Sequence, residues 1–113
     1  MSSVRRISQQ LLKHQRQGGN LYLGGQLKVV LEVQNPAPIK TAGIRYTTDD
    51  WSTWKERDGI WCSRDDGSDT DQFLVLTESD LRPGIRVEYA LYCRVNDSTW
   101  WDNNNSTNYS AQF

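Results

Sequence analysis

Apolar and polar residues alternate strictly along the stretch from Leu27 to Gln34. The apolar positions fall on every second residue, at Leu27, Val29, Leu31 and Val33. Side chains of a β-strand point alternately to the two faces of a sheet, so this period predicts a strand with one buried face. Asn35-Pro36-Ala37-Pro38 ends the strand, because proline cannot donate a hydrogen bond to a neighbouring strand.

The same period recurs along the rest of the chain. Pro83-Gly84 and Asn96-Asp97 predict tight turns, and the acidic stretch 64–71 predicts an exposed turn. With no long helix, seven or eight short strands indicate an all-β protein, a sandwich or a barrel, and we favour the sandwich. The further strands cover residues 44–48 with Arg45 and Thr47 directed outward, 59–64, 73–77, 85–95, 99–101 and 108–113.

The segment 4–17 is compatible with either a helix or a first strand, since its few apolar residues are scattered between polar ones. Gly18-Gly19-Asn20 ends it in both cases. A length of 113 residues fits one domain. We therefore divide the chain into an N-terminal arm or edge strand, residues 1–19, and a β-sandwich domain, residues 20–113.

Composition and charge exclude several classes of function. A net charge of −1 offers no basic surface for nucleic acid, and no stretch approaches the ~20 apolar residues that span a bilayer. A single histidine, His14, and two cysteines outside C-x-x-C spacing cannot form a zinc site or a Cys-His pair. No phosphate-binding loop or paired carboxylates are visible. We expect a protein without catalytic activity, metal or cofactor.

The residues up to Gly19 carry charges but no apolar segment typical of a signal peptide. A cytoplasmic location is therefore expected, with Cys62 and Cys93 both reduced.

Aromatic residues point toward a binding surface. Five Trp and five Tyr stand against two Phe, and Trp and Tyr are the aromatics that suit half-exposed positions. Trp100 and Trp101 are adjacent on a strand, so they point to opposite faces; we place Trp100 in the core and Trp101 on the surface. Four Asn follow, at positions 103–105 and 108. An indole face beside uncharged amides suits a neutral sugar, although an Asn run can also simply shape a loop.

Two motifs resemble carbohydrate-binding module family 21. The first is Asp50-Trp51 after the strand that ends at Tyr46-Thr47-Thr48; the second is Trp101-Asp102-Asn103-Asn104-Asn105 with Asn108-Tyr109. The resemblance covers Leu27 to Phe113. The family includes the starch-binding domain of a fungal glucoamylase and the glycogen-targeting regulatory subunits of protein phosphatase 1. It implies an immunoglobulin-like antiparallel β-sandwich of seven to eight strands that binds α-1,4-glucan, such as starch, glycogen or malto-oligosaccharide.

The resemblance also implies site residues. Trp51 and Trp101 match the family's stacking positions, and Asn103 and Asn108 match its hydrogen-bonding positions.

Three further positions depart from the family pattern or extend it. The family's third aromatic falls on Ala90 here, and Tyr92, two residues further along the same face, is the candidate to replace it. Trp54 is the candidate to extend the main surface. The aromatic of a second family site falls on Pro38, which argues against that site, and Trp61 is either a replacement or a core residue.

The alternative function is that of a protein-interaction or targeting module, such as a phosphatase glycogen-targeting domain. The partner would then be a phosphatase or a glycogen-metabolising enzyme. A short phosphatase-docking pattern of the basic-Val-x-Phe type is not visible in the sequence.

Overall fold

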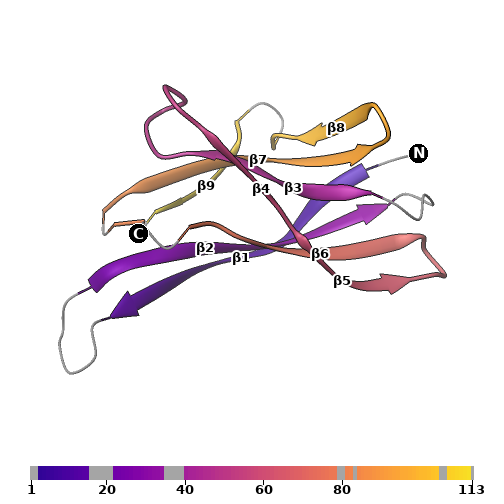
Figure 1. Cartoon of the computed structure of the whole chain (residues 1–113), viewed down its shortest axis with the longest axis horizontal. Helices are drawn as coiled ribbons and strands as arrows, with labels where there is room; N and C mark the ends of the chain where they lie inside the picture. Colours follow the sequence, from indigo (N-terminus) through magenta and orange to yellow (C-terminus); the bar gives the residue numbers. More distant parts are fainter. Residues whose placement is uncertain are drawn as a thin grey trace.

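The computed structural model describes residues 3–15, 22–34, 40–78, 81–82, 84–104 and 107–112. Two antiparallel sheets face each other as a sandwich, one in the order β1-β2-β6-β5 and the other in the order β4-β3-β7-β8, with β9 also paired to β7 (Figure 1). The strands within the described residues are β1 (Ser3–Gln15), β2 (Tyr22–Gln34), β3 (Thr41–Thr47), β4 (Lys55–Asp58), β5 (Ile60–Asp65), β6 (Thr70–Leu76), β7 (Arg86–Val95), β8 (Ser98–Asp102) and β9 (Tyr109–Gln112).

The described residues thus hold nine strands, where the sequence pattern predicts seven to eight. The additional strand is β4, whose sequence Lys-Glu-Arg-Asp has no apolar alternation. It forms because it pairs with β3 at the edge of its sheet, where three of its four residues are exposed and need no apolar side chain.

The core lies between the sheets and follows the predicted alternation. The apolar residues of β2 at positions 27, 29, 31 and 33 are fully buried, which confirms this strand and its buried face. On the opposite sheet, Val87, Tyr89, Leu91 and Cys93 of β7 are also fully buried and belong to the same cluster. Burying each such side chain contributes about 1.5–3 kcal/mol, so these two strands supply much of the driving force for folding.

The middle of the other face of β7 is covered as well, although Arg86 on that face is exposed and Glu88 and Arg94 are half-buried. Ala90 is 7% exposed and Tyr92 is fully buried. Tyr92 pairs with Gly43 on β3, and a Cβ at Gly43 would lie 2.6 Å from the Tyr92 hydroxyl oxygen. Glycine is therefore required at position 43, because the Arg57 carbonyl oxygen, which would lie still closer to that Cβ, and the Tyr92 ring occupy the space that a side chain would fill.

Residues 4–17, which are compatible with a helix or a strand, form strand β1 as far as they are described. β1 pairs with β2 along its length and lies at the edge of its sheet. The Arg6 guanidinium lies 4.5 Å from the centre of the Tyr109 ring, so β1 also contacts the C-terminal strand of the opposite sheet. Gly18-Gly19-Asn20 lies outside the described residues.

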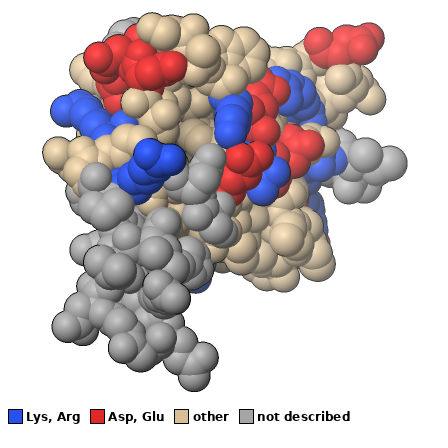
Figure 2. Space-filling model, turned by 60° about the vertical axis from the view of Figure 1, so that its left-hand side comes forward, with Lys and Arg blue, Asp and Glu red and all other residues tan. Residues whose placement is uncertain are grey.

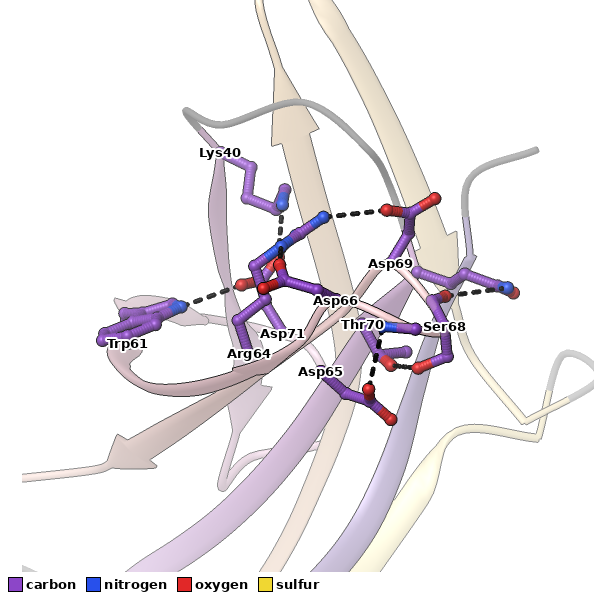
Figure 3. Close-up of polar contacts among 11 residues, drawn as sticks. Lys40, Trp61, Arg64, Asp65, Asp66, Ser68, Asp69, Thr70 and Asp71 are labelled. Carbon is purple, nitrogen blue, oxygen red and sulfur yellow. Dashed lines mark hydrogen bonds and ion pairs between the residues drawn. The ribbon is translucent and has the colours of Figure 1, made fainter.

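A buried ion pair joins the two layers where β6 begins. The side chains of Lys40 and Asp71 are each only 4% exposed and form an ion pair. Asp71 also accepts hydrogen bonds from Trp61 Nε1 at 2.9 Å and from Arg64 Nη1 at 2.7 Å, as Figure 3 shows. The predicted exposed turn at 64–71 is therefore wrong at Asp71, which faces inward on β6 because a lysine from before β3 reaches it.

The environment of Asp71 acts on its pKa in two directions. Burial by itself raises the pKa, but the hydrogen bonds and charges of Lys40, Trp61 and Arg64 outweigh burial and hold the pKa below its ordinary value. The carboxylate is consequently ionised throughout the neutral range.

Asp71→Asn should lower the free energy of unfolding by about 3 kcal/mol, because it leaves the buried Lys40 charge without a counter-charge. The matched control is Asp66→Asn, which removes another partner of Arg64 whose side chain is 92% exposed; it should change stability by less than about 0.5 kcal/mol. Urea unfolding at neutral pH measures both.

The pH dependence provides a second check on Asp71. A depressed folded-state pKa stabilises the fold above the unfolded value of about 3.9 and stops doing so as pH falls below it. Wild-type stability should thus decline more steeply on acidification than that of Asp71→Asn. Equal slopes would show that the Lys40–Asp71 pair does not contribute in solution.

Candidate functional site

A groove of about 300 Å³ lies on the outer face of the sheet that contains β3 and β7. It combines residues from β3, β7, β8 and the loops that follow β3 and β8. Four of the six residues predicted for the site line it. The lining residues are Arg45, Trp51, Ala90, Trp101, Asn103 and Asn108.

The register of the strands explains the floor of the groove. Arg45 on β3 is paired with Ala90 on β7. On the other side of β7, Leu91 pairs with Asp102, so Ala90 and Asn103 are the next neighbours across the strands. Arg45, Ala90 and Asn103 thus form one row across the sheet. The small side chain of Ala90 leaves space above the middle of this row, which an aromatic residue would fill.

Trp101 rises at one side of this floor. It is 44% exposed, and its ring meets the ring of Tyr92 edge to face, with the ring centres 5.7 Å apart. Its neighbour Trp100 points to the other face, as alternation predicts, but it is only half-buried and is not part of the core cluster. β8 ends its sheet, and an edge strand is incompletely covered by the layer beneath it.

Tyr92 does not lie where a stacking residue is expected. It is fully buried and does not line the groove, so it presents no ring face to a ligand. Because Gly43 has no side chain, the Tyr92 ring reaches over β3, and its hydroxyl donates a hydrogen bond of 2.5 Å to Asp58 on β4. Burial and this carboxylate both raise the pKa of Tyr92. Tyr92 instead supports Trp101 from below.

Trp54 is next to the groove but not in its lining. It is 50% exposed, and its ring lies against the guanidinium of Arg45, with Cζ 3.9 Å from the ring centre. It lines a smaller neighbouring cavity of about 80 Å³. Trp54 therefore contacts the groove through Arg45, a residue that the sequence analysis assigned only to an outward face. The position of Arg45 on the outward face, six residues before Trp51, is the sequence feature that could have indicated its place in the groove.

The loop that carries Trp51 is held from below by Thr47. Asp50 and Trp51 both have positive φ angles, 54° and 68°, which are unfavourable for residues with a side chain. The hydroxyl oxygen of Thr47 accepts a hydrogen bond of 3.1 Å from the Trp51 amide. It also lies 2.7 Å from Asp49 Oδ1 and 2.5 Å from the Thr53 carbonyl oxygen. Thr47 lies on the face of β3 opposite to the core residue Tyr46, as predicted, but the loop covers it, so it is only 2% exposed.

Asp49 completes this loop. Its carboxylate accepts hydrogen bonds from the Thr53 hydroxyl at 2.5 Å and from the Thr53 amide at 2.9 Å. Hydrogen bonds from Thr53 and Thr47 lower the pKa of Asp49. The loop therefore places Trp51 with a set of short-range bonds that requires no contact from the ligand.

The Asn-rich loop after β8 both shapes its own backbone and lines the groove. Asn104, with a φ of 54°, shapes the loop: its amide nitrogen bonds Asp102 and its side chain donates to the Asn108 carbonyl. Asn103 and Asn108 line the groove and are joined by a backbone hydrogen bond of 2.7 Å. The Tyr109 hydroxyl donates to Asp102 at 2.5 Å, and burial together with this bond raises the pKa of Tyr109 to about 12.

Trp61 belongs to a different surface. It lies on β5, in the other sheet, and is 57% exposed, so it is not a core residue. Its indole nitrogen donates a hydrogen bond to Asp71. Pro38 lies outside the described residues.

Charge is mixed on the face that Figure 2 shows, where basic and acidic side chains are interspersed. Among the described residues there is no cluster of three His, Cys, Asp or Glu that could bind a metal ion. In the same part of the chain, no helix is long and apolar enough to cross a membrane. Cys62 is exposed and Cys93 is buried, both as free thiols.

Thr47→Val should lower the free energy of unfolding by about 1–3 kcal/mol, since it removes a buried hydroxyl that hydrogen-bonds the backbone of the Trp51 loop. It should also broaden the amide NMR signal of Trp51. Thr48→Val, at the exposed neighbouring position, is the matched control and should change neither quantity. If the two variants behaved alike, Thr47 would not hold the loop.

Comparison with known proteins places this geometry in a family. The family model described as carbohydrate/starch-binding module (family 21) matches residues 9–112. Human protein phosphatase 1 regulatory subunit 3A is 30% identical over 87 residues, covering 74% of this chain and 8% of the relative. Human regulatory subunit 3B is 36% identical over 85 residues, covering 70% and 29%. GLC7-interacting protein 2 of Saccharomyces cerevisiae is 32% identical over 89 residues, covering 70% and 16%. The chain thus spans less than a third of these curated relatives.

Two solved structures share the fold. One is the carbohydrate-binding module of the muscle glycogen-targeting subunit of protein phosphatase 1, with a TM-score of 0.66, 26% identity and coverage of 95% of this chain and 73% of that one. The other is the starch-binding domain of Rhizopus oryzae glucoamylase in complex with β-cyclodextrin and maltoheptaose, with a TM-score of 0.68, 19% identity and coverage of 98% and 93%. At that identity the second similarity supports the fold alone. With its antiparallel β-sandwich and the family match over nearly its whole length, the chain belongs to carbohydrate-binding module family 21.

Proposed function

We propose that this domain binds α-1,4-glucan in the groove between Trp51 and Trp101, without catalysing a reaction on it. One observation carries the proposal: two indoles and two amides converge on a single groove, one from the loop after β3 and the others, some fifty positions later in sequence, from β8 and the loop that follows it. An indole face suits the C–H face of a glucose ring, and an amide can both donate to and accept from hydroxyl groups.

The two kinds of side chain have separate roles in this proposal. Trp51 and Trp101 stack on glucose units, which removes apolar surface from water. Asn103 and Asn108 then orient the chain by hydrogen bonds to its hydroxyls. Trp51, Asn103 and Asn108 are each held by a hydrogen bond within the protein, so these residues lose little further freedom when the ligand binds.

Affinity for a short oligosaccharide should be modest. The groove is open and small, and each exposed hydrogen bond replaces one made with water, so its net contribution is only about 0.5–1.5 kcal/mol. Firm retention on starch or glycogen would require several copies or a second contact with the polymer.

The relatives favour a second role beside sugar binding. They are regulatory subunits of a protein phosphatase, and one solved relative is described as glycogen-targeting. This domain would then place a phosphatase or a glycogen-metabolising enzyme on the polymer as part of a longer protein. Capture on amylose resin tests the sugar contact; capture of purified phosphatase catalytic subunit by the domain tests the protein contact.

Trp101→Ala should weaken binding to β-cyclodextrin and maltoheptaose roughly tenfold or more, as expected for a central aromatic contact. Isothermal titration calorimetry measures the affinity, and circular dichroism checks that the fold is retained. Trp61→Ala removes another exposed indole, 57% against 44% for Trp101, from the other sheet and is the matched control, with unchanged affinity expected in the groove.

Two results would overturn the proposal. One is a wild-type domain that binds neither ligand at millimolar concentration. The other is loss of binding in Trp61→Ala but not in Trp101→Ala, which would move the sugar to the other sheet. Asn103→Ala and Asn108→Ala test the proposed hydrogen bonds to the glucan separately from the stacking. Neither amide is part of the core.

A further inference from the structure

Arg45 has an unusual position among the residues of the groove. Its guanidinium lies between two indoles, with Cζ 3.9 Å from the ring centre of Trp54 and 4.7 Å from that of Trp101. Cation–π contacts of this length are favourable by about 0.5–1 kcal/mol each at exposed sites. The Arg45 side chain is about one-third exposed, and it lines the groove directly.

Glu56 on β4 fixes the orientation of this guanidinium. Arg45 donates to Glu56 Oε2 from Nε at 2.9 Å and from Nη2 at 2.6 Å. Arg94 donates to the same carboxylate at 3.0 and 3.1 Å. Burial alone raises the pKa of Glu56, but the two guanidiniums outweigh it and lower the pKa, so Glu56 stays ionised and keeps its hold on Arg45 near neutral pH.

These contacts use one side of the guanidinium and leave another side open. Glu56 takes the side formed by Nε and Nη2. No described residue accepts a hydrogen bond from Nη1, so the end of the fork, made by Nη1 and the second hydrogen of Nη2, remains available. An arginine that is already immobilised by two rings and a carboxylate loses little further side-chain entropy when a ligand binds.

We propose that Arg45 is a ligand-contacting specificity residue, whose guanidinium donates paired hydrogen bonds to the adjacent 2- and 3-hydroxyls of a glucose unit in the groove. This inference rests on the proposed glucan binding and extends it. The 1,4 linkage uses the oxygens at positions 1 and 4, so the 2- and 3-hydroxyls are the adjacent free pair of an internal unit. A planar fork of N–H groups matches two neighbouring oxygens, whereas a lone 6-hydroxyl would use only half of it.

Trp54 and Glu56 are positioning residues in this proposal, because they hold Arg45 and do not line the groove themselves. Arg94 provides an internal comparison. It binds the same carboxylate and stacks over Tyr92 at 4.1 Å, but it is not in the groove lining. Arg45 and Arg94 are thus matched in charge and in partner, and they differ in access to the ligand.

The experiment compares wild type, Arg45→Gln, Arg45→Lys and the control Arg94→Gln by calorimetry with three ligands. These are β-cyclodextrin, its derivative methylated at all 2- and 3-hydroxyls, and its derivative methylated at all 6-hydroxyls. Wild type should bind the 6-methylated ligand about as well as the parent and the 2,3-methylated ligand much more weakly. Arg45→Gln should bind the parent roughly tenfold more weakly, as expected for loss of a hydrogen bond from a charged group, and should discriminate less between the derivatives.

Arg45→Lys keeps the charge but not the planar fork, so it should lose discrimination as well. Arg94→Gln should behave as wild type. A second measurement follows the side-chain Nε–H signals by NMR: β-cyclodextrin should shift the Arg45 signal and leave that of Arg94 in place. A purely structural brace for Trp101 would alter affinity without changing the preference between the methylated ligands.

The outcomes separate this inference from the function on which it rests. If wild type binds β-cyclodextrin and Arg45→Gln retains both affinity and discrimination, the role of Arg45 is refuted and glucan binding stands. If Arg94→Gln loses as much as Arg45→Gln, the effect is one of charge or folding, and the role is likewise refuted. If wild type binds none of the ligands, glucan binding itself fails.

Discussion

The pairing of β7 with β3 and β8 is the constraint on which the rest of this structure depends. Because side chains alternate along a strand, one register places Val87, Tyr89, Leu91 and Cys93 in the core and sets the outer rows at the same time. One outer row brings together Arg45, Ala90 and Asn103, and the next brings together Gly43, Tyr92 and Trp101. A slip of one residue would exchange the core and outer faces, so the drive to bury the apolar face also fixes the geometry of the groove.

Small residues in these two rows leave space on the outer face of the sheet, and that space becomes the groove or holds a neighbouring aromatic ring. Ala90 keeps the groove floor low, and Gly43 gives the Tyr92 ring a place to lie. Above this base, the two loops are closed by side-chain hydrogen bonds and hold several non-glycine residues at positive φ. Such strain persists only where the surroundings determine the conformation, which is consistent with a binding surface that is ordered before its ligand arrives.

Two carboxylates organise the polar part of the molecule in similar ways. Asp71 in the interior and Glu56 on the outer face each bind two cationic side chains, with a tryptophan beside them. Their surroundings differ in exposure. Around Asp71 the Lys40–Asp71 pair is buried and only Arg64 reaches the surface, so the cluster links the two layers of the fold. Around Glu56 the charged side chains are about one-third exposed, so these ion pairs contribute little to the free energy of unfolding. Their main effect is to orient Arg45 beside the groove.

The sequence by itself determined the parts of this protein that depend on one strand or one motif. Alternation predicted β2 and the core face of β7, and the two motifs predicted that Trp51, Trp101, Asn103 and Asn108 belong together. The tertiary structure decided what depends on neighbours distant in the chain: the burial of Tyr92 over Gly43, the buried pair at Asp71, and the place of Arg45 between two indoles. The physical reason is that alternation distinguishes the two faces of a strand, whereas the neighbouring strands decide whether a face is covered.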